Sequence, residues 1–145
     1  MRILDKEALQ LDLTKLGFDP WSYEKFSHAI HQPYGMWNVD RQQFRQAIWN
    51  LCVNAFQAMP EGGELRVTTA VTGRNLVLRV SDSGEGIVAT DLAQIFEPFF
   101  STKADGSGLG LALVHRIVQE HGGEIDVQSR PGAGTTFTLT LPAHA

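Results

Sequence analysis

The sequence has little of what a membrane protein, a disulfide-bonded secreted protein or a nucleic-acid-binding protein requires. Its single cysteine, Cys52, cannot form a disulfide within the chain, and it lies in an apolar stretch typical of a core residue. No apolar run approaches the roughly 20 residues of a membrane-spanning helix, and the N-terminus lacks a signal-peptide pattern. No basic stripe accompanies the net charge of −4, which argues against nucleic acid. These absences predict a cytoplasmic chain without membrane contact of its own, which a longer protein could still anchor.

The composition is that of one folded domain. Hydrophobic residues make up 43% of the 145 residues and charged residues 19%, as in globular proteins rather than disordered ones. A chain of this length buries roughly two thirds of its unfolded surface, so its core needs no disulfide. Residues 1–39 mix alternating and helical spacings and predict no definite element, whereas a clear pattern begins at Asp40. The sequence therefore divides into an N-terminal segment, 1–39, and a domain, 40–145.

The predicted elements of this domain follow the order helix, hairpin, helix, helix, hairpin. Asp40 can cap the first helix, and Gly122-Gly123 can end the last one. The predicted helices are 40–60, 91–96 with Thr90 as its cap, and 111–121. The predicted strands, from alternating apolar and polar residues, are 65–71, 76–80, 124–129 and 135–141. This order predicts a two-layer α/β sandwich, with a mixed, mostly antiparallel sheet and helices on one face.

Four short motifs stand in a fixed order along this domain, and each is ambiguous alone. Asn50 and Asn54 lie four residues apart, so they share one helix face, and a carboxamide oxygen suits Mg²⁺. Two helical asparagines also simply hydrogen-bond to solvent. Asp82, in the string Asp82-Ser83-Gly84-Glu85-Gly86, could accept a hydrogen bond from the exocyclic amine of adenine, where guanine has an oxygen. The same string also fits an ordinary turn.

The third and fourth motifs belong to one long loop. Lys103 follows the string Phe96-Glu97-Pro98-Phe99-Phe100, so its ammonium could meet a terminal phosphate beside an aromatic anchor. A solvated lysine after a hydrophobic cluster is the plainer interpretation. The string Gly106-Ser107-Gly108-Leu109-Gly110 precedes a helix, whose N-terminal N–H groups favour phosphate. It is neither a Walker A sequence nor a Rossmann fingerprint. The four motifs in this order are nevertheless a specific signal.

These motifs resemble the N, G1, F and G2 boxes of the histidine-kinase catalytic domain, within the superfamily of DNA gyrase B, MutL and the heat-shock chaperone ATPases. The resemblance covers 40–142, and 54–59 is similar to nitrogen-regulation and pilus-regulation sensors. It implies a Bergerat-type sandwich that binds ATP and Mg²⁺ beneath a flexible lid. Asn54 would hold the metal, Asp82 the adenine and Lys103 the phosphates. The implied nucleotide contacts are Asn54, Gln57, Asp82, Gly84, Gly86, Ile87, Phe96, Lys103, Gly106, Ser107, Gly108, Leu109, Gly110, Leu111 and Thr135, the last through water.

The resemblance also indicates the reaction. Asn50 stands four residues before Asn54. In the hydrolytic members of the superfamily, and in its serine kinases, the corresponding position resembles a glutamate that activates water or a hydroxyl. Because an asparagine cannot act as a general base, Asn50 favours transfer to histidine over hydrolysis. The predicted catalytic residues are Asn50, Asn54 and Lys103. The implied function is the ATP-binding catalytic domain of a two-component sensor histidine kinase. A stand-alone serine kinase or ATPase of this superfamily and a nucleotide-binding regulatory module are the alternatives.

A complete sensor kinase also resembles a helical-hairpin dimerisation domain carrying the phosphoacceptor histidine, followed by the catalytic domain. About forty residues precede the N box here, too few for that hairpin. His28 begins a string, His28-Ala29-Ile30-His31-Gln32-Pro33, that resembles the acceptor motif, but Ala29 stands where an acidic residue belongs. We expect His28 to be a structural histidine. The implied partners are a histidine-bearing dimerisation domain of the same kinase and the receiver domain of a response regulator.

Overall fold

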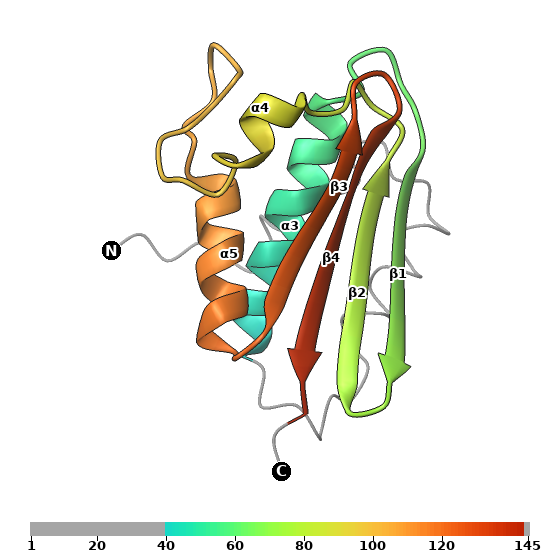
Figure 1. Ribbon diagram of the computed structural model, residues 1–145, viewed down its shortest axis with the longest axis vertical. Helices are drawn as coiled ribbons and strands as arrows, with labels where there is room; N and C mark the ends of the chain where they lie inside the picture. The colour runs from blue at the N-terminus through green and yellow to red at the C-terminus, as the bar shows by residue number, and fades with distance from the viewer. Residues whose placement is uncertain (1–39, 144–145) are drawn as a thin grey trace, which may run out of the picture. The chain divides into compact units, whose positions relative to one another are not determined.

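The structure is a computed structural model that describes residues 40–143. The predicted N-terminal segment, 1–39, and His28 within it lie outside the described residues. The described elements are α3 (Arg41–Gln57), β1 (Leu65–Thr72), β2 (Asn75–Asp82), α4 (Ala89–Leu92), α5 (Gly110–Glu120), β3 (Glu124–Arg130) and β4 (Gly134–Pro142) (Figure 1). Within 40–143 no helix has the length and apolar character to cross a membrane.

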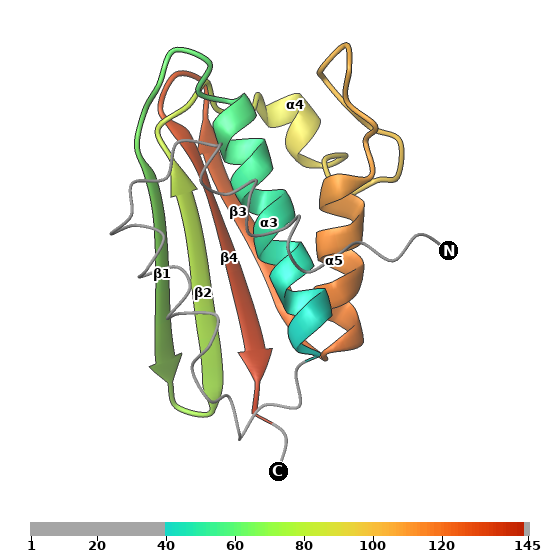
Figure 2. The same ribbon diagram turned by 180° about the vertical axis from the view of Figure 1, so that it is seen from behind.

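A four-stranded antiparallel sheet forms one layer, in the order β1-β2-β4-β3. In the central pair Asp82 lies opposite Thr135, which brings the ends of β2 and β4 that carry these residues to the same edge of the sheet. Both views show α3 and α5 side by side over one face of the sheet (Figures 1 and 2). The predicted two-layer α/β sandwich is confirmed, and no parallel pair occurs among the described strands.

The core lies between the helices and the sheet, and the sequence periods that predict the elements also place it there. Successive residues of β2 alternate, so that Leu76, Leu78 and Val80 are buried against the helices while Arg79 is exposed. The buried residues of α3 are Phe44, Ala47, Ile48, Leu51, Cys52 and Ala55. Each large side chain so buried stabilises the fold by roughly 1.5–3 kcal/mol. Burial also raises the pKa of the Cys52 thiol to about 12, as suits an unreactive core residue.

The helix α3 begins and the helix α5 ends where the sequence predicts, although α3 ends at Gln57, before the predicted Pro60. The carboxylate of Asp40 accepts hydrogen bonds from the N–H groups of Gln42 and Gln43, at 2.9 and 3.1 Å, and so caps α3. At the end of α5, Gly122 takes a φ of 67°, and Gly123 donates its N–H to the carbonyl of Val118 at 2.9 Å. A left-handed glycine at this position satisfies carbonyl groups that the last turn leaves unpaired.

The predicted helix 91–96 with a Thr90 cap is wrong. The helix α4 runs from Ala89 to Leu92, and Thr90 lies inside it with its hydroxyl directed to the carboxylate of Asp91. Beyond the helix the backbone forms i to i+3 turns, with Gln94 bonded to Asp91 and Glu97 bonded to Gln94. The apolar residues that suggest a longer helix are instead placed by tertiary contacts, since Ile95 is buried in this run of turns.

The backbone of Gly134, the first residue of β4, packs directly on the end of β2. Gly134 has a φ of +85°, and a Cβ there would overlap the carbonyl oxygen of Asp82. We expect Gly134→Ala to lower the free energy of unfolding by about 3 kcal/mol or more, since strain and overlap combine. Gly132→Ala is the matched control, because Gly132 has a φ of +76° but nothing within 4 Å of an added Cβ.

For the control only the backbone strain of about 1–2 kcal/mol should remain. Chemical denaturation of both variants measures the two losses. Equal losses would show that the close contact between Gly134 and β2 is unimportant for stability.

Candidate functional site

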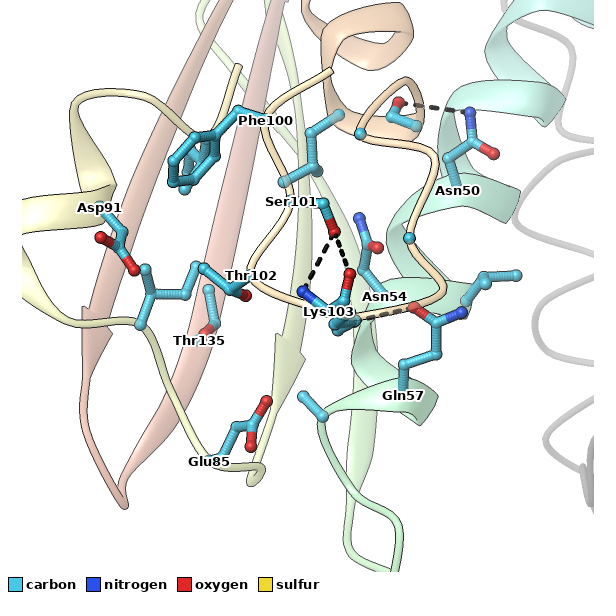
Figure 3. Close-up of a pocket in the computed structure, with 18 of the residues that line it drawn as sticks. Asn50, Asn54, Gln57, Glu85, Asp91, Phe100, Ser101, Thr102, Lys103 and Thr135 are labelled. Carbon is cyan, nitrogen blue, oxygen red and sulfur yellow. Dashed lines mark hydrogen bonds between the residues drawn. The ribbon is translucent and has the colours of Figure 1, made fainter. Parts of the chain in front are cut away.

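The motif residues surround a cavity of about 530 Å³ between α3, the ends of β2 and β4, and the loop before α5 (Figure 3). The predicted site residues that line it are Asn50, Asn54, Gln57, Asp82, Gly86, Ile87, Lys103, Gly106, Ser107, Gly108, Gly110, Leu111 and Thr135. Asn50 and Thr135, which are 85 positions apart in the sequence, thus line the same cavity. The fold therefore brings the four motifs together.

The helix α3 contributes a row of carboxamides. Figure 3 shows Asn50, Asn54 and Gln57 extending from the helix toward the loop that carries Lys103. Asn50 donates from Nδ2 to the carbonyl of Gly110 at 3.4 Å, which joins α3 to the start of α5. The side chain of Asn54 lines the cavity and makes no hydrogen bond with another residue of 40–143. Its oxygen is therefore available to a ligand.

Asp82 is the acidic group at the end of β2. One carboxylate oxygen, Oδ1, accepts hydrogen bonds from the N–H groups of Gly84 at 2.9 Å and Thr135 at 3.3 Å. Burial raises the pKa of the Asp82 carboxyl, although these two N–H groups and the charge of Lys103 act in the opposite direction. The two backbone bonds fix the orientation of the carboxylate in the cavity wall.

Lys103, from the loop between α4 and α5, lines the same cavity. Its Nζ donates to Oε1 of Gln57 at 2.8 Å, and its backbone N–H donates to Oγ of Ser101 at 3.1 Å (Figure 3). Burial lowers the pKa of the Lys103 ammonium, while the carboxylates of Glu85 and Asp82 raise it. The half-buried ammonium of Lys103 thus places a positive charge near these two carboxylates in a cavity that also offers hydrogen-bond acceptors.

The loop before α5 is closed at its base. Phe99 donates its N–H to the carbonyl of Gly108 at 2.9 Å. Phe99 has a φ of 68°, a left-handed conformation that is rare for a residue with a side chain, and the residue is 79% exposed. A Cβ on Gly108 would overlap the backbone of Phe99. The residues between these two positions therefore form a loop whose ends are packed together.

Three predicted site residues do not line the cavity. Gly84 packs against the backbone of Ala58, which a Cβ would overlap, and it acts by donating its N–H to Asp82. Phe96 stacks on His115 with ring centroids 5.2 Å apart, so it anchors the start of the loop to α5. The side chain of Leu109 is 45% exposed, just before α5 begins.

Other residues line the cavity without having been assigned to it from the sequence. They are Val53, Ala58, Glu85, Val88, Asp91, Ile95, Phe100, Ser101, Thr102, Asp105 and Phe137. Glu85 and Asp105 lie within or beside the motifs, and Ala58 follows Asn54 by one helical turn, so position alone could have indicated them. Ile95 and Phe137 carry only the apolar signal of core residues. For these two the sequence holds no local sign of a binding role.

Comparison with known proteins decides the family. Residues 39–145 match the family of histidine kinase-, DNA gyrase B- and HSP90-like ATPases. The chain belongs to this family. The match covers every described residue of the sandwich and all four motifs, so the predicted superfamily is confirmed. The chain is an ATP-binding domain of this superfamily.

The relatives of this domain include sensor histidine kinases, which confirms the predicted resemblance to the histidine-kinase branch. It is 49% identical over 106 residues to the sensor histidine kinase ZraS of Escherichia coli K12, covering 73% of this chain and 23% of that protein. The catalytic domain of histidine kinase ThkA, nucleotide-free, matches with a TM-score of 0.66 at 34% identity over 72% of this chain and 70% of that chain. Full-length ShkA in complex with AMPPNP matches with a TM-score of 0.64 at 35% identity, over 73% and 23%. The chain thus spans about a quarter of its curated relative's length.

Proposed function

We propose that the chain carries the catalytic domain of a sensor histidine kinase, assigned to residues 40–145, which binds Mg²⁺-ATP in this cavity. It delivers the γ-phosphate to a histidine on a dimerisation domain. The observation that supports this most directly is the convergence of the four motifs on one cavity of about 530 Å³. The carboxylate of Asp82, the side chain of Lys103 and the glycine-rich loop before α5 all line it.

Asp82 is the group that selects adenine in this proposal. Its Oδ1 is already occupied by two backbone N–H groups, so its second oxygen is the acceptor offered to the ligand. An exocyclic amine can donate to it, whereas the carbonyl of guanine or hypoxanthine would face it with lone pairs. A site built from a buried acceptor rejects a ligand that lacks the matching donor.

The phosphates lie, in this proposal, between Lys103 and the start of α5. The residue before α5, Leu109, makes no side-chain hydrogen bond to the first turn. The first N–H groups of this 11-residue helix therefore lack side-chain capping partners, and helix N-termini favour anions. The ammonium of Lys103, held at 2.8 Å from Gln57, adds a positive charge.

The donor set in the cavity fits Mg²⁺ bound together with a nucleotide. The described residues contain no cluster of three or more carboxylate, histidine or cysteine side chains that could hold a metal alone. Asn54 offers one unpaired carboxamide oxygen, and Mg²⁺ commonly takes the rest of its shell from phosphate and water. When bound, the ion neutralises phosphate charge. Asn54 is the residue proposed to hold it.

Transfer to histidine is favoured over hydrolysis by the residues of α3. The helix contains no Asp or Glu, so it supplies no carboxylate to deprotonate water beside the metal residue. Asn50, at the critical position, is bonded to Gly110 and cannot accept a proton as a base. A neutral imidazole nitrogen can attack a phosphoryl group without prior deprotonation. The partners proposed are therefore a histidine-bearing dimerisation domain and, downstream, a receiver domain, all in the cytoplasm.

The chain should label a supplied histidine-bearing hairpin and not itself. Purified chain is incubated with γ-phosphate-labelled ATP and Mg²⁺, with and without such a hairpin from a sensor kinase of the ZraS type, after ATP binding is confirmed by calorimetry. We expect acid-labile label on the hairpin only, because phosphohistidine is acid-labile. Acid-stable label would favour a serine kinase, steady phosphate release an ATPase, and binding without either a regulatory module. Label on the chain that the substitution His28→Ala removes would identify His28 as an acceptor.

A further inference from the structure

The hydroxyl of Ser129, at the end of β3, connects three segments around the base of the cavity. It accepts a hydrogen bond from the N–H of Ile87 at 2.8 Å and donates to the carbonyl of Gly134 at 3.0 Å. It also lies 2.8 Å from the hydroxyl of Thr135. Ser129 does not line the cavity, whereas Thr135 and Ile87 do.

The direction of the bond between the two hydroxyls follows from counting hydrogens. A serine hydroxyl has one hydrogen and two lone pairs. A carbonyl cannot donate, so the hydrogen of Ser129 is committed to Gly134. The N–H of Ile87 takes one lone pair, and the bond at 2.8 Å to Thr135 must use the other. Thr135 is therefore the donor in that bond.

This count leaves the Thr135 hydroxyl with only lone pairs to offer to the cavity. Its hydrogen is directed at Ser129, and the residue is only 5% exposed, so it has little freedom to exchange that partner for solvent. The neighbouring backbone N–H of Thr135 is committed to Asp82. A water that donated to both acceptors would likewise present lone pairs, so the polarity is the same with or without a bridging water.

We propose that Ser129 is a positioning residue that holds the Thr135 hydroxyl as a hydrogen-bond acceptor and thereby helps the cavity select a purine with an exocyclic amine at C6. The inference rests on the proposed function, in which Asp82 and Thr135 face the base. Without Ser129 the threonine hydroxyl can rotate and donate. A hydroxyl that donates can form a hydrogen bond with the oxygen of a 6-oxo purine. The discrimination between 6-amino and 6-oxo purines, rather than nucleotide binding alone, therefore depends on Ser129.

The test compares the affinities of the full chain for ATP and inosine triphosphate by calorimetry. We expect Ser129→Ala to weaken ATP binding by about fivefold and to leave inosine triphosphate binding unchanged or stronger, as the loss of one oriented hydrogen bond implies. The ATP-to-inosine triphosphate ratio of affinities then falls by about fivefold to tenfold. Ser129→Thr keeps the hydroxyl and should keep the ratio within about twofold of the wild type.

Ser81→Ala is the matched control. Ser81 also pairs its hydroxyl with that of a threonine across two strands, Thr136, but both alternate with Asp82 and Thr135 and so lie on the other face of the sheet. Its loss should change stability and leave the ratio of affinities unchanged. Thermal unfolding of each variant shows that the compared chains are folded.

A double-mutant cycle separates positioning from general support. Thr135→Val alone should lower the ratio, and adding Ser129→Ala to it should lower the ratio no further, because Ser129 acts through Thr135. Equal weakening of both nucleotides in Ser129→Ala, an unchanged ratio, or additive effects in the cycle would overturn the positioning role. A wild-type chain that binds ATP but does not discriminate would instead reject the base assignment, and one that binds no ATP would reject the proposed function.

Discussion

Asp82→Asn is expected to weaken ATP binding by about 100-fold or more while leaving the fold intact. The asparagine oxygen can still accept from the N–H groups of Gly84 and Thr135, so the local hydrogen bonds that hold the wall remain. The amide nitrogen then replaces the second carboxylate oxygen. A donor would face the exocyclic amine of adenine, and the neighbouring Lys103 would lose an opposite charge. Calorimetry measures the affinity, and circular dichroism with thermal unfolding measures the fold.

The control for Asp82→Asn is Asp126→Asn, which removes the same charge from the outer face of β3, where the residue is exposed. Acidification supplies a second control. Because burial raises the pKa of Asp82, its carboxyl takes up a proton at a higher pH than a free aspartate. ATP affinity should therefore fall earlier on acidification in wild type and Asp126→Asn, and the residual affinity of Asp82→Asn should not follow. Unchanged affinity in Asp82→Asn would reject the adenine assignment.

Asn54→Ala is expected to reduce phosphoryl transfer to a histidine-bearing hairpin by about 100-fold or more, as loss of one charge-stabilising group in an active site typically does. The side chain makes no hydrogen bond within the described part of the chain, so its removal should change stability little. The decisive measurement is ATP affinity with Mg²⁺ and with a chelator. Wild type should bind more tightly with Mg²⁺, and the variant should lose that difference.

Asn50→Ala is the comparison for Asn54→Ala, since both asparagines lie on one face of α3 and line the same cavity. The Nδ2 of Asn50 donates to the carbonyl of Gly110. Removing this side chain should therefore loosen the start of α5, while ATP binding should remain dependent on Mg²⁺. If the two variants lose Mg²⁺ dependence equally, the metal ligand is not Asn54 alone.

The fold could be predicted from the sequence wherever one local signal coincided with the period of burial. Asp40 begins α3, Gly122 ends α5, and the alternating segments are the four strands, each lengthened by one to three residues in the structure. Helical periodicity failed to predict the structure of the segment 91–96, after the second motif. Its apolar residues Ile95 and Phe96 are placed by packing on other elements, so the backbone makes turns where periodicity indicates a helix.

The motif residues of the site could also be predicted, because polar and glycine residues in a fixed order are visible in one dimension. Their supports could not. Ser129 is an ordinary strand serine in the sequence, and its three partners come from a loop and from the first two residues of the next strand. Gly84 has the spacing of a base contact but acts through Asp82 and Ala58. The supporting roles of Ser129 and Gly84 depend on which segments come into contact in the folded chain, and local sequence patterns do not indicate those contacts.

The bond that joins Phe99 to Gly108 has a consequence for how the domain tolerates change. This hydrogen bond of 2.9 Å holds the two ends of the loop together. The length of the residues between Phe99 and Gly108 can therefore vary without moving α5. Lengthening a flexible loop twofold costs only about 0.6 kcal/mol in closure entropy. The exposed position Ala104 is accordingly suited to an inserted reporter peptide or an attached dye. The bond between Phe99 and Gly108 would separate the helix and sheet from the inserted group, and the label would lie next to Lys103 and Asp105, which line the cavity.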